Sequence, residues 1–278
     1  MNCVICGTAM DPVLAPATMH PTCGVTFAEP GNEDPFSALL KSELVEIIRW
    51  HEQQNPRGHQ ALIGPSEIGD PCDRRIGYRI AGIPACNKDF DAWPAIVGTA
   101  IHSWLQTAVN NWMTCHGSTD WRTETTLAVN EFVEGHADLY WNKHDTVIDH
   151  KTQGPDVFKK TKVNGPAPGY VIQAQVYGYA FEQAGLPVKK VALAFFSRAG
   201  WLRDMYVWTA DYDSAIAKNA IARMYGIAAQ VVNLDILKES HRWEQVQATP
   251  SNTCAFCPWY NPGKDPEVGA DANGCPGR

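Results

Sequence analysis

Two neighbouring segments of this chain carry carboxylates in a pattern typical of paired strands: Phe132-Val133-Glu134-Gly135-His136-Ala137-Asp138-Leu139-Tyr140 and Thr146-Val147-Ile148-Asp149-His150-Lys151. Side chains alternate between the two faces of a strand, so we expect Asp149 and Lys151 to point the same way. The polar residues 141–145 between the segments predict a hairpin turn. Such a hairpin brings Asp138 alongside Asp149 and Lys151.

Two carboxylates that converge on one point repel each other unless they share a proton or bind a hard divalent cation. A lysine beside that cation can position a water molecule or stabilise charge on a phosphate. Asp138, Asp149 and Lys151 therefore predict a metal-dependent phosphodiesterase site. The sequence has no Gly-x-x-x-x-Gly-Lys-Ser/Thr phosphate-binding loop, so we expect no ATP-driven motor in this chain.

Several short motifs, taken in order, resemble the RecB-like branch of the PD-(D/E)XK nuclease superfamily. They are Ser66-Glu67-Ile68 leading to Cys72-Asp73-Arg74-Arg75, Gly98-Thr99-Ala100-Ile101-His102, Gly135-x-x-Asp138, Asp149-x-Lys151 and Gln173-x-x-x-Tyr177. Cys254-Ala255-Phe256-Cys257-Pro258, with Cys275 beyond, resembles the C-terminal cysteines of the iron–sulfur members. Those members include the AddB nuclease domain and the CRISPR-associated exonucleases, which have many phage-encoded relatives. The resemblance spans residues 66 to 275.

The resemblance implies an α/β fold with a restriction-endonuclease-like core, in which helices flank a mixed sheet. It implies that His102, Asp138, Asp149 and the main-chain carbonyl of His150 bind Mg²⁺ or Mn²⁺, and that Lys151 acts on the attacking water with Gln173 and Tyr177 in support. Alternation turns the His150 side chain away from the metal. A histidine ligand favours manganese somewhat over magnesium, which prefers oxygen.

Spacing alone gives plainer interpretations of three of these residues. His102 then reads as a packed or surface residue of an amphipathic helix. Gln173 and Tyr177, four residues apart, read as a polar helix surface. Glu124, on the strand before Gly135, either assists a second ion or is an exposed strand residue.

The nine cysteines divide into two sets of ligands and two remaining thiols, Cys86 and Cys115. Cys3-x-x-Cys6 with His20-x-x-Cys23 predicts a small tetrahedral zinc knuckle. The second set is Cys72, Cys254, Cys257 and Cys275, which suits either a [4Fe–4S] cluster or a tetrathiolate zinc site. The Pro- and Gly-rich insert before Cys275 must loop out and return for this set to form. The paired Cys-x-x-Cys motifs favour metal in a reducing cytosol over disulfides.

Composition is that of an ordinary globular protein, with 278 residues, 45% hydrophobic and 19% charged. A net charge of -7 and a pI near 5.7 argue against a generally basic nucleic-acid surface. Any DNA contact must use a local basic groove. The candidates are Arg74, Arg75, Lys159, Lys160, Lys162, Lys189, Lys190, Arg198 and Arg203, and most of them read equally well as solvated charges. We find no apolar run long enough to span a bilayer and no secretory signal, and we expect a cytoplasmic protein in a bacterium or an infected host.

Patterning predicts a knuckle and linker over residues 1–32 and a nuclease domain over 33–278 that the C-terminal cysteines close. The expected helices are 36–51, 74–81, 94–113, 171–184 and 211–233. The expected strands are three between 121 and 151, then 188–196 and 201–208, with a long loop at 154–169.

We expect a metal-dependent DNA exonuclease that acts on single-stranded ends in recombination, replication or repair, with partner proteins from those processes. Two alternatives use the same residues. One is a structure-specific endonuclease. The other is a catalytically inert DNA-binding or adaptor protein that metal holds together, although it gives no reason for Asp138, Asp149 and Lys151 to occur together.

Overall fold

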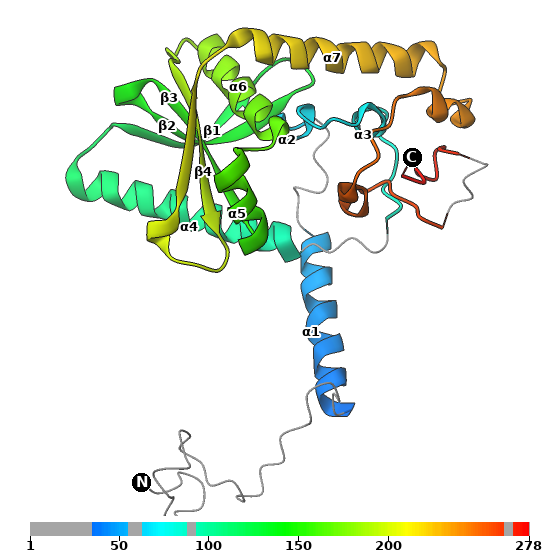
Figure 1. The fold of residues 1–278 in the computed structure, drawn as a ribbon, viewed down its shortest axis with the longest axis horizontal. Coiled ribbons are helices and arrows are strands. Elements are labelled where there is room, and N and C mark those ends of the chain that lie inside the picture. The colour runs from blue at the N-terminus through cyan, green and yellow to red at the C-terminus, as the bar shows by residue number, and fades with distance from the viewer. Residues whose placement is uncertain (1–34, 55–62, 88–92, 264–268, 278) are drawn as a thin grey trace, which may run out of the picture. The chain divides into compact units, whose positions relative to one another are not determined.

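The computed structural model describes residues 35–54, 63–87, 93–263 and 269–277 (Figure 1). The chain divides into two compact units, Met1–Gly58 and His59–Arg278. In the first unit the described element is helix α1 (Pro35–Gln53), which confirms the helix predicted from residue 36. The predicted zinc-knuckle residues Cys3, Cys6, His20 and Cys23 lie outside the described residues.

The second unit is built on a five-stranded mixed sheet, as the sequence predicts. Its order is β1 (Trp121–Ala128), β2 (Glu134–Trp141), β3 (Thr146–Gln153), β4 (Lys190–Ser197) and β5 (Tyr206–Asp211). Neighbouring strands are antiparallel except β3 and β4, which are parallel. A 3₁₀ turn, η2 (Asn142–His144), joins β2 to β3 and confirms the predicted hairpin.

The helices of this unit are α2 (Pro65–Ile68), α3 (Asp73–Ile80), α4 (Trp93–His116), α5 (Pro155–Asn164), α6 (Pro168–Gln183) and α7 (Ser214–Asn233). Helices α6 and α4 cover opposite faces of the sheet, with α6 in front and α4 behind in Figure 1. Adjacent residues of β3 show this directly. The Asp149 carboxylate is bonded to Gln173 of α6, whereas the ring of His150 lies against His102 of α4. No described helix is long and apolar enough to cross a membrane.

The core forms where α6 packs on the middle strands. Residues 191–195 of β4 are all buried, as expected for a strand that is covered on both faces. The ring of Tyr140 on β2 packs against Phe181 of α6 with the ring centres 4.7 Å apart, and the ring centres of Phe195 and Tyr170 are 6.2 Å apart. These contacts fix the register of α6, and with it the positions of Gln173 and Tyr177 over β3.

The long loop predicted over residues 154–169 is wrong. Residues Pro155–Asn164 form α5, and α6 begins at Pro168. Each proline stands in the first turn of its helix, where its fixed φ suits the helix and its missing N–H costs nothing. Gly165, with φ 79°, then ends α5 in a conformation that favours glycine. The two prolines are helix starts, not signs of an irregular loop.

The strand predicted over residues 201–208 begins later than expected. Residues Leu202–Asp204 form a 3₁₀ turn, η3, at the tip of the β4–β5 hairpin, and β5 starts at Tyr206. Alternate residues Tyr206, Trp208 and Ala210 are less exposed than their neighbours, which sets the register of β5. Helix α7 likewise starts at Ser214, because Asp213 caps it by accepting the Ala215 N–H at 2.8 Å.

A second apolar cluster joins α3 to the C-terminal segment. Tyr78 packs between Trp243 of the 3₁₀ turn η4 (Ser240–Gln245) and Trp259, at ring distances of 4.2 and 5.7 Å. The Tyr78 hydroxyl donates a hydrogen bond to the Asp271 carbonyl at 2.8 Å. A further 3₁₀ turn, η5 (Asn252–Phe256), carries Cys254. The start and end of the second unit therefore pack together, as the paired cysteines predict.

Candidate functional site

Strand β3 places Asp149 and Lys151 on one face, as alternation predicts. Lys151 Nζ lies 2.6 Å from Asp149 Oδ2 and donates a hydrogen bond to Gln173 Oε1 at 2.7 Å. The other end of the Gln173 amide donates to Asp149 Oδ1 at 3.1 Å. Asp149, Lys151 and Gln173, which the sequence analysis names as site residues, therefore contact one another.

Asp138 lies where the β2–β3 ladder ends. The paired residues run from Trp141↔Thr146 to Leu139↔Ile148, and Asp138 comes next along β2. Its Oδ2 atom accepts the His150 main-chain N–H at 2.6 Å, so the carboxylate itself bridges the two strands. This position leaves Asp138 Oδ1 to face α4.

Helix α4 supplies His102 to this carboxylate. His102 Nδ1 lies 3.1 Å from Asp138 Oδ1. The hydrogen bond to Asp138 raises the pKa of His102 above its usual value, against the effect of burial. Burial alone would raise the pKa of Asp138, but the bond from His102 and the charges of His102 and His150 hold that pKa below its usual value. A protonated His102 and an ionised Asp138 are therefore the favoured forms when no cation is bound.

Glu124 completes a compact group that the sequence prediction left aside. One ligand atom each from His102, Glu124 and Asp138 lie within 4.8 Å of one another. Glu124 stands opposite Asp138 in β1, between the pairs Thr123↔Leu139 and Thr125↔Ala137. Its φ of 45° is left-handed, a conformation that costs a non-glycine residue of order 1–3 kcal/mol and is often found at functional sites. Cross-strand register with Asp138 is the signal that identifies Glu124; the strained backbone leaves no trace in the sequence.

The buried side of the site holds an incompletely satisfied carboxylate. Asp149 is 3% exposed, and its Oδ2 atom makes no hydrogen bond of normal geometry. Burial raises the pKa of Asp149 to about 6, against the lowering effect of the Lys151 ammonium. A buried carboxylate oxygen with spare acceptor capacity is what a hard cation requires.

His150 and Tyr177 support the site from opposite faces of the sheet. The His150 ring lies on the α4 face, edge-on to His102 at 5.9 Å, with Nδ1 4.0 Å from Asp138 Oδ2. Burial lowers the pKa of His150. Burial and the charges of Asp149 and Asp138 raise the pKa of the Tyr177 hydroxyl. That hydroxyl is close to Gly135, where an added Cβ would lie 3.4 Å from it and 2.5 Å from Pro65 Cδ.

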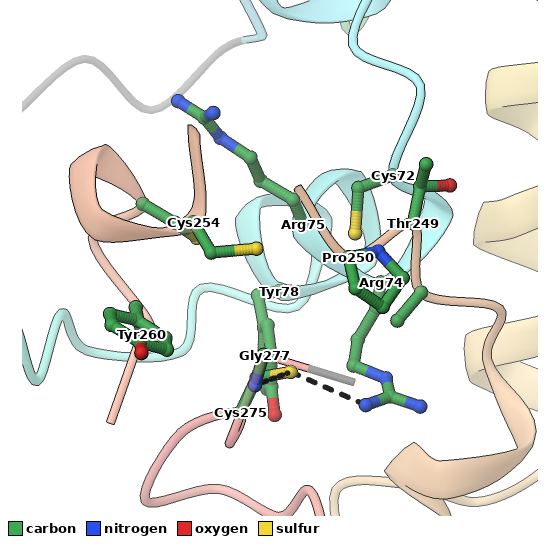
Figure 2. A pocket seen from close by; sticks show the side chains of 12 residues that line it. Cys72, Arg74, Arg75, Tyr78, Thr249, Pro250, Cys254, Tyr260, Cys275 and Gly277 are labelled. Atoms are coloured by element: carbon green, nitrogen blue, oxygen red, sulfur yellow. Dashed lines mark hydrogen bonds between the residues drawn. The ribbon is translucent and has the colours of Figure 1, made fainter. Parts of the chain in front are cut away.

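The four cysteines of the second set line one small cavity of about 30 Å³, although they come from distant parts of the sequence (Figure 2). Cys72, Cys254, Cys257 and Cys275 are all free of disulfides, as are Cys86 and Cys115. Cys275 returns to Cys257 through main-chain bonds, since its N–H donates to the Trp259 carbonyl at 2.8 Å and its carbonyl accepts from Asn261 at 2.9 Å. Cys275 thus lies beside the residues that directly follow Cys257.

Hydrogen-bond donors lie close to two of these sulfur atoms. Arg74 Nη1 lies 3.3 Å from Cys275 Sγ, drawn as a dashed line in Figure 2, and the Gly277 N–H lies 3.4 Å from the same sulfur. The Ser251 N–H lies 3.4 Å from Cys254 Sγ. Arg74 is 3% exposed, so its charge acts at short range in a low dielectric. Burial raises the pKa of Cys257, so a metal must displace a proton there. The cavity suits thiolates that share a bound cation.

No protein-family model and no curated protein matches the chain. Among solved structures it is similar to an alkaline exonuclease from Laribacter hongkongensis, with 12% identity and a TM-score of 0.44 over 64% of this chain and 92% of that one. The same enzyme in complex with dAMP gives 12% identity and a TM-score of 0.43 over the same shares. A phage-related exonuclease from Haemophilus somnus gives 15% identity and a TM-score of 0.33 over 47% of this chain and 70% of that one. The likeness is a distant one.

Proposed function

We propose that this chain is a metal-dependent deoxyribonuclease of the RecB-like PD-(D/E)XK family. The observation that carries the proposal is that two groups of polar side chains lie on neighbouring elements of one sheet. The first is His102, Glu124 and Asp138, whose ligand atoms lie within 4.8 Å of one another. The second is Asp149, Lys151 and Gln173, on the next strand and on α6. An inert adaptor gives no reason for a buried aspartate held by Lys151 and Gln173 on the strand next to a second carboxylate, because burying charge costs free energy.

The residues fit a hard divalent cation. Asp138, Asp149 and Glu124 offer carboxylate oxygens, His102 offers a nitrogen, and the His150 carbonyl is the remaining candidate ligand. Bound Mg²⁺ or Mn²⁺ would neutralise charge on the phosphate and make a bound water a better nucleophile. The imidazole favours Mn²⁺, as the sequence predicts.

Lys151 acts on the attacking water and on the charge of the phosphate in this proposal. Gln173 holds the Lys151 ammonium through Oε1 and the Asp149 carboxylate through Nε2, so it positions both groups with one side chain. Tyr177 packs behind them and keeps its proton at neutral pH, since its pKa is raised. Its role is to fix α6 against β2, not to exchange a proton.

A [4Fe–4S] cluster is the proposed occupant of the cysteine cavity, and zinc is the alternative. A tetrathiolate zinc ion, with Zn–S bonds of about 2.3 Å, holds its sulfurs ~3.8 Å apart. Within the part of the chain that the structure describes, the cysteine sulfurs do not form a group of three within 4.8 Å. In the proposed cluster, by contrast, each thiolate binds a different iron. The zinc knuckle of Cys3, Cys6, His20 and Cys23 remains a proposal from the sequence.

Single-stranded DNA ends are the proposed substrate, in phage or bacterial recombination, replication or repair. The cytoplasm is the matching compartment, because free thiols and an iron–sulfur cluster need reducing conditions. The test compares end-labelled linear DNA with closed circular single strands in Mn²⁺. An exonuclease degrades only the linear DNA. Cleavage of circles identifies the endonuclease, and no cleavage of either identifies the inert adaptor and overturns the proposal.

A further inference from the structure

The tip of the β4–β5 hairpin exposes a large aromatic side chain for which the fold gives no packing role. Trp201 is 69% exposed and the neighbouring Leu202 is 77% exposed. The guanidinium of Arg203 lies over the Trp201 ring, 5.0 Å from its centre. A flat aromatic ring held beside a cation in open solvent is suited to stack on a nucleobase.

Further basic residues lie on the segments beside this ring, although the net charge of the chain is -7. Lys162 of α5 donates to the Asp204 carbonyl at 3.3 Å, which fixes α5 beside the hairpin tip, where Figure 1 also draws it. Lys159 lies one turn before Lys162 on the same side of α5. We call Trp201, Arg203, Arg198, Lys159 and Lys162 the tip surface.

The tip surface continues from the candidate active strand. The Arg198 N–H donates to the Gln153 carbonyl at 2.8 Å, two residues beyond Lys151, and Phe195 pairs with Lys151 across β3 and β4. Helix α5 also begins directly after β3. Trp201 comes six positions after Phe195, so its Cα lies at most about 20 Å from that of Phe195. About six stacked nucleotides cover that distance.

We propose that the tip surface binds the single-stranded part of the DNA substrate, with Trp201 stacked on a base and the lysines and arginines on the phosphates. This inference rests on the proposed function and specifies how the substrate is held. A duplex keeps its bases stacked internally, so Trp201 discriminates in favour of single strands, whereas the basic residues serve both.

The test measures the binding of a fluorescent single strand of about 20 thymidines by anisotropy in EDTA, so that no cleavage occurs. Trp201→Ala weakens this binding about tenfold, Trp201→Phe keeps most of it, and neither changes binding to a blunt duplex. Trp104→Ala is the matched control, since Trp104 is 68% exposed on α4 and lies outside the tip surface. The double variant Arg198→Ala/Lys159→Ala loses two phosphate contacts. The slope of log K against log salt concentration should therefore become shallower by about 1.4.

Wild-type cleavage of the same strand in Mn²⁺ separates the two proposals. If wild type cleaves and Trp201→Ala binds the single strand as tightly as Trp104→Ala does, the proposed DNA-binding role of the tip surface is wrong and the nuclease assignment stands. An equal loss on duplex and single strand also overturns stacking by Trp201. If wild type binds but does not cleave, the nuclease assignment is wrong, and the tip surface stands only if Trp201→Ala binds the single strand more weakly than Trp104→Ala does. If wild type neither binds nor cleaves, both are wrong.

Discussion

Lys151 is the residue on which both the buried charges and the proposed chemistry depend. Its ammonium lies between Asp149 Oδ2 and Gln173 Oε1, at 2.6 and 2.7 Å. Removing one partner of such a pair leaves a buried charge that is uncompensated. A cation supplied by the solvent would compensate Asp149 in the same way, so the loss of Lys151 should be more harmful to catalysis than to the fold.

We expect Lys151→Ala to keep DNA binding and to lower the cleavage rate by about 10²–10³, the usual cost of one electrostatic contact in a transition state. The rate is measured at saturating Mn²⁺ on linear DNA. Lys238→Ala, which removes an exposed lysine paired with Asp235, is the control and should cleave normally. A Lys151→Ala rate within a few-fold of wild type would reject the role of Lys151.

Binding of Mn²⁺ should weaken as the pH falls through about 6. Asp149, with its pKa raised to about 6, and His102, with its pKa also raised, must both be deprotonated to act as ligands. Protons on Asp149 compete with the cation below about pH 6 and protons on His102 compete below its own raised pKa, so the affinity is fully present only above both pKa values. Calorimetric titration of the DNA-free protein from pH 5 to 7.5 checks this. A flat affinity over that range would exclude Asp149 and His102 as ligands.

At the scale of elements, strand periodicity predicts which residues of β2 and β3 carry the site's carboxylates and lysine. Alternation predicts the pairing of Asp149 with Lys151, which lie 2.6 Å apart, and the polar turn after Trp141 predicts the β2–β3 hairpin that carries Asp138. Other parts depend on tertiary structure. The approach of α4 to Asp138 follows from packing on the far face of the sheet, and the importance of Glu124 follows from a left-handed backbone that no local pattern reveals. The prolines that begin α5 and α6 lead to a loop prediction because proline is common in loops as well as in the first turn of helices.

Helix α2 approaches β2 so closely that Gly135 has no room for a side chain. We expect Gly135→Ala to lower the free energy of unfolding by about 1–3 kcal/mol, because its Cβ would lie 2.5 Å from Pro65 Cδ. Gly226→Ala is the contrasting control: its Cβ meets nothing within 4 Å on α7, and it should stabilise by about 0.5–1 kcal/mol. Denaturant unfolding of both variants measures the difference. Equal stabilities would show that α2 does not pack as described.

At the scale of the whole molecule, the cysteine cavity joins residue 72 to the C-terminal segment. We expect Cys254→Ala to lose iron and to melt at a lower temperature, because metal binding at a site that forms only on folding contributes to the free energy of folding. Cys115→Ala, which removes an exposed thiol of α4, should keep both. Metal analysis by mass spectrometry with thermal melting decides the point. Full iron content in Cys254→Ala would contradict a cluster there, and zinc in place of iron in the wild type would identify the alternative metal.

The most direct test of the account is cleavage of end-labelled linear single-stranded DNA in Mn²⁺ by wild type, Asp138→Asn, Asp149→Asn and the double variant. Asparagine keeps the size and one carbonyl oxygen but removes the charge that holds the cation. We predict that the wild type releases nucleotides from the ends, that each single change abolishes release, and that the double variant is no worse than either, because residues acting as one unit are non-additive. Wild-type rates in Asp138→Asn and Asp149→Asn would contradict the metal site and the nuclease built on it.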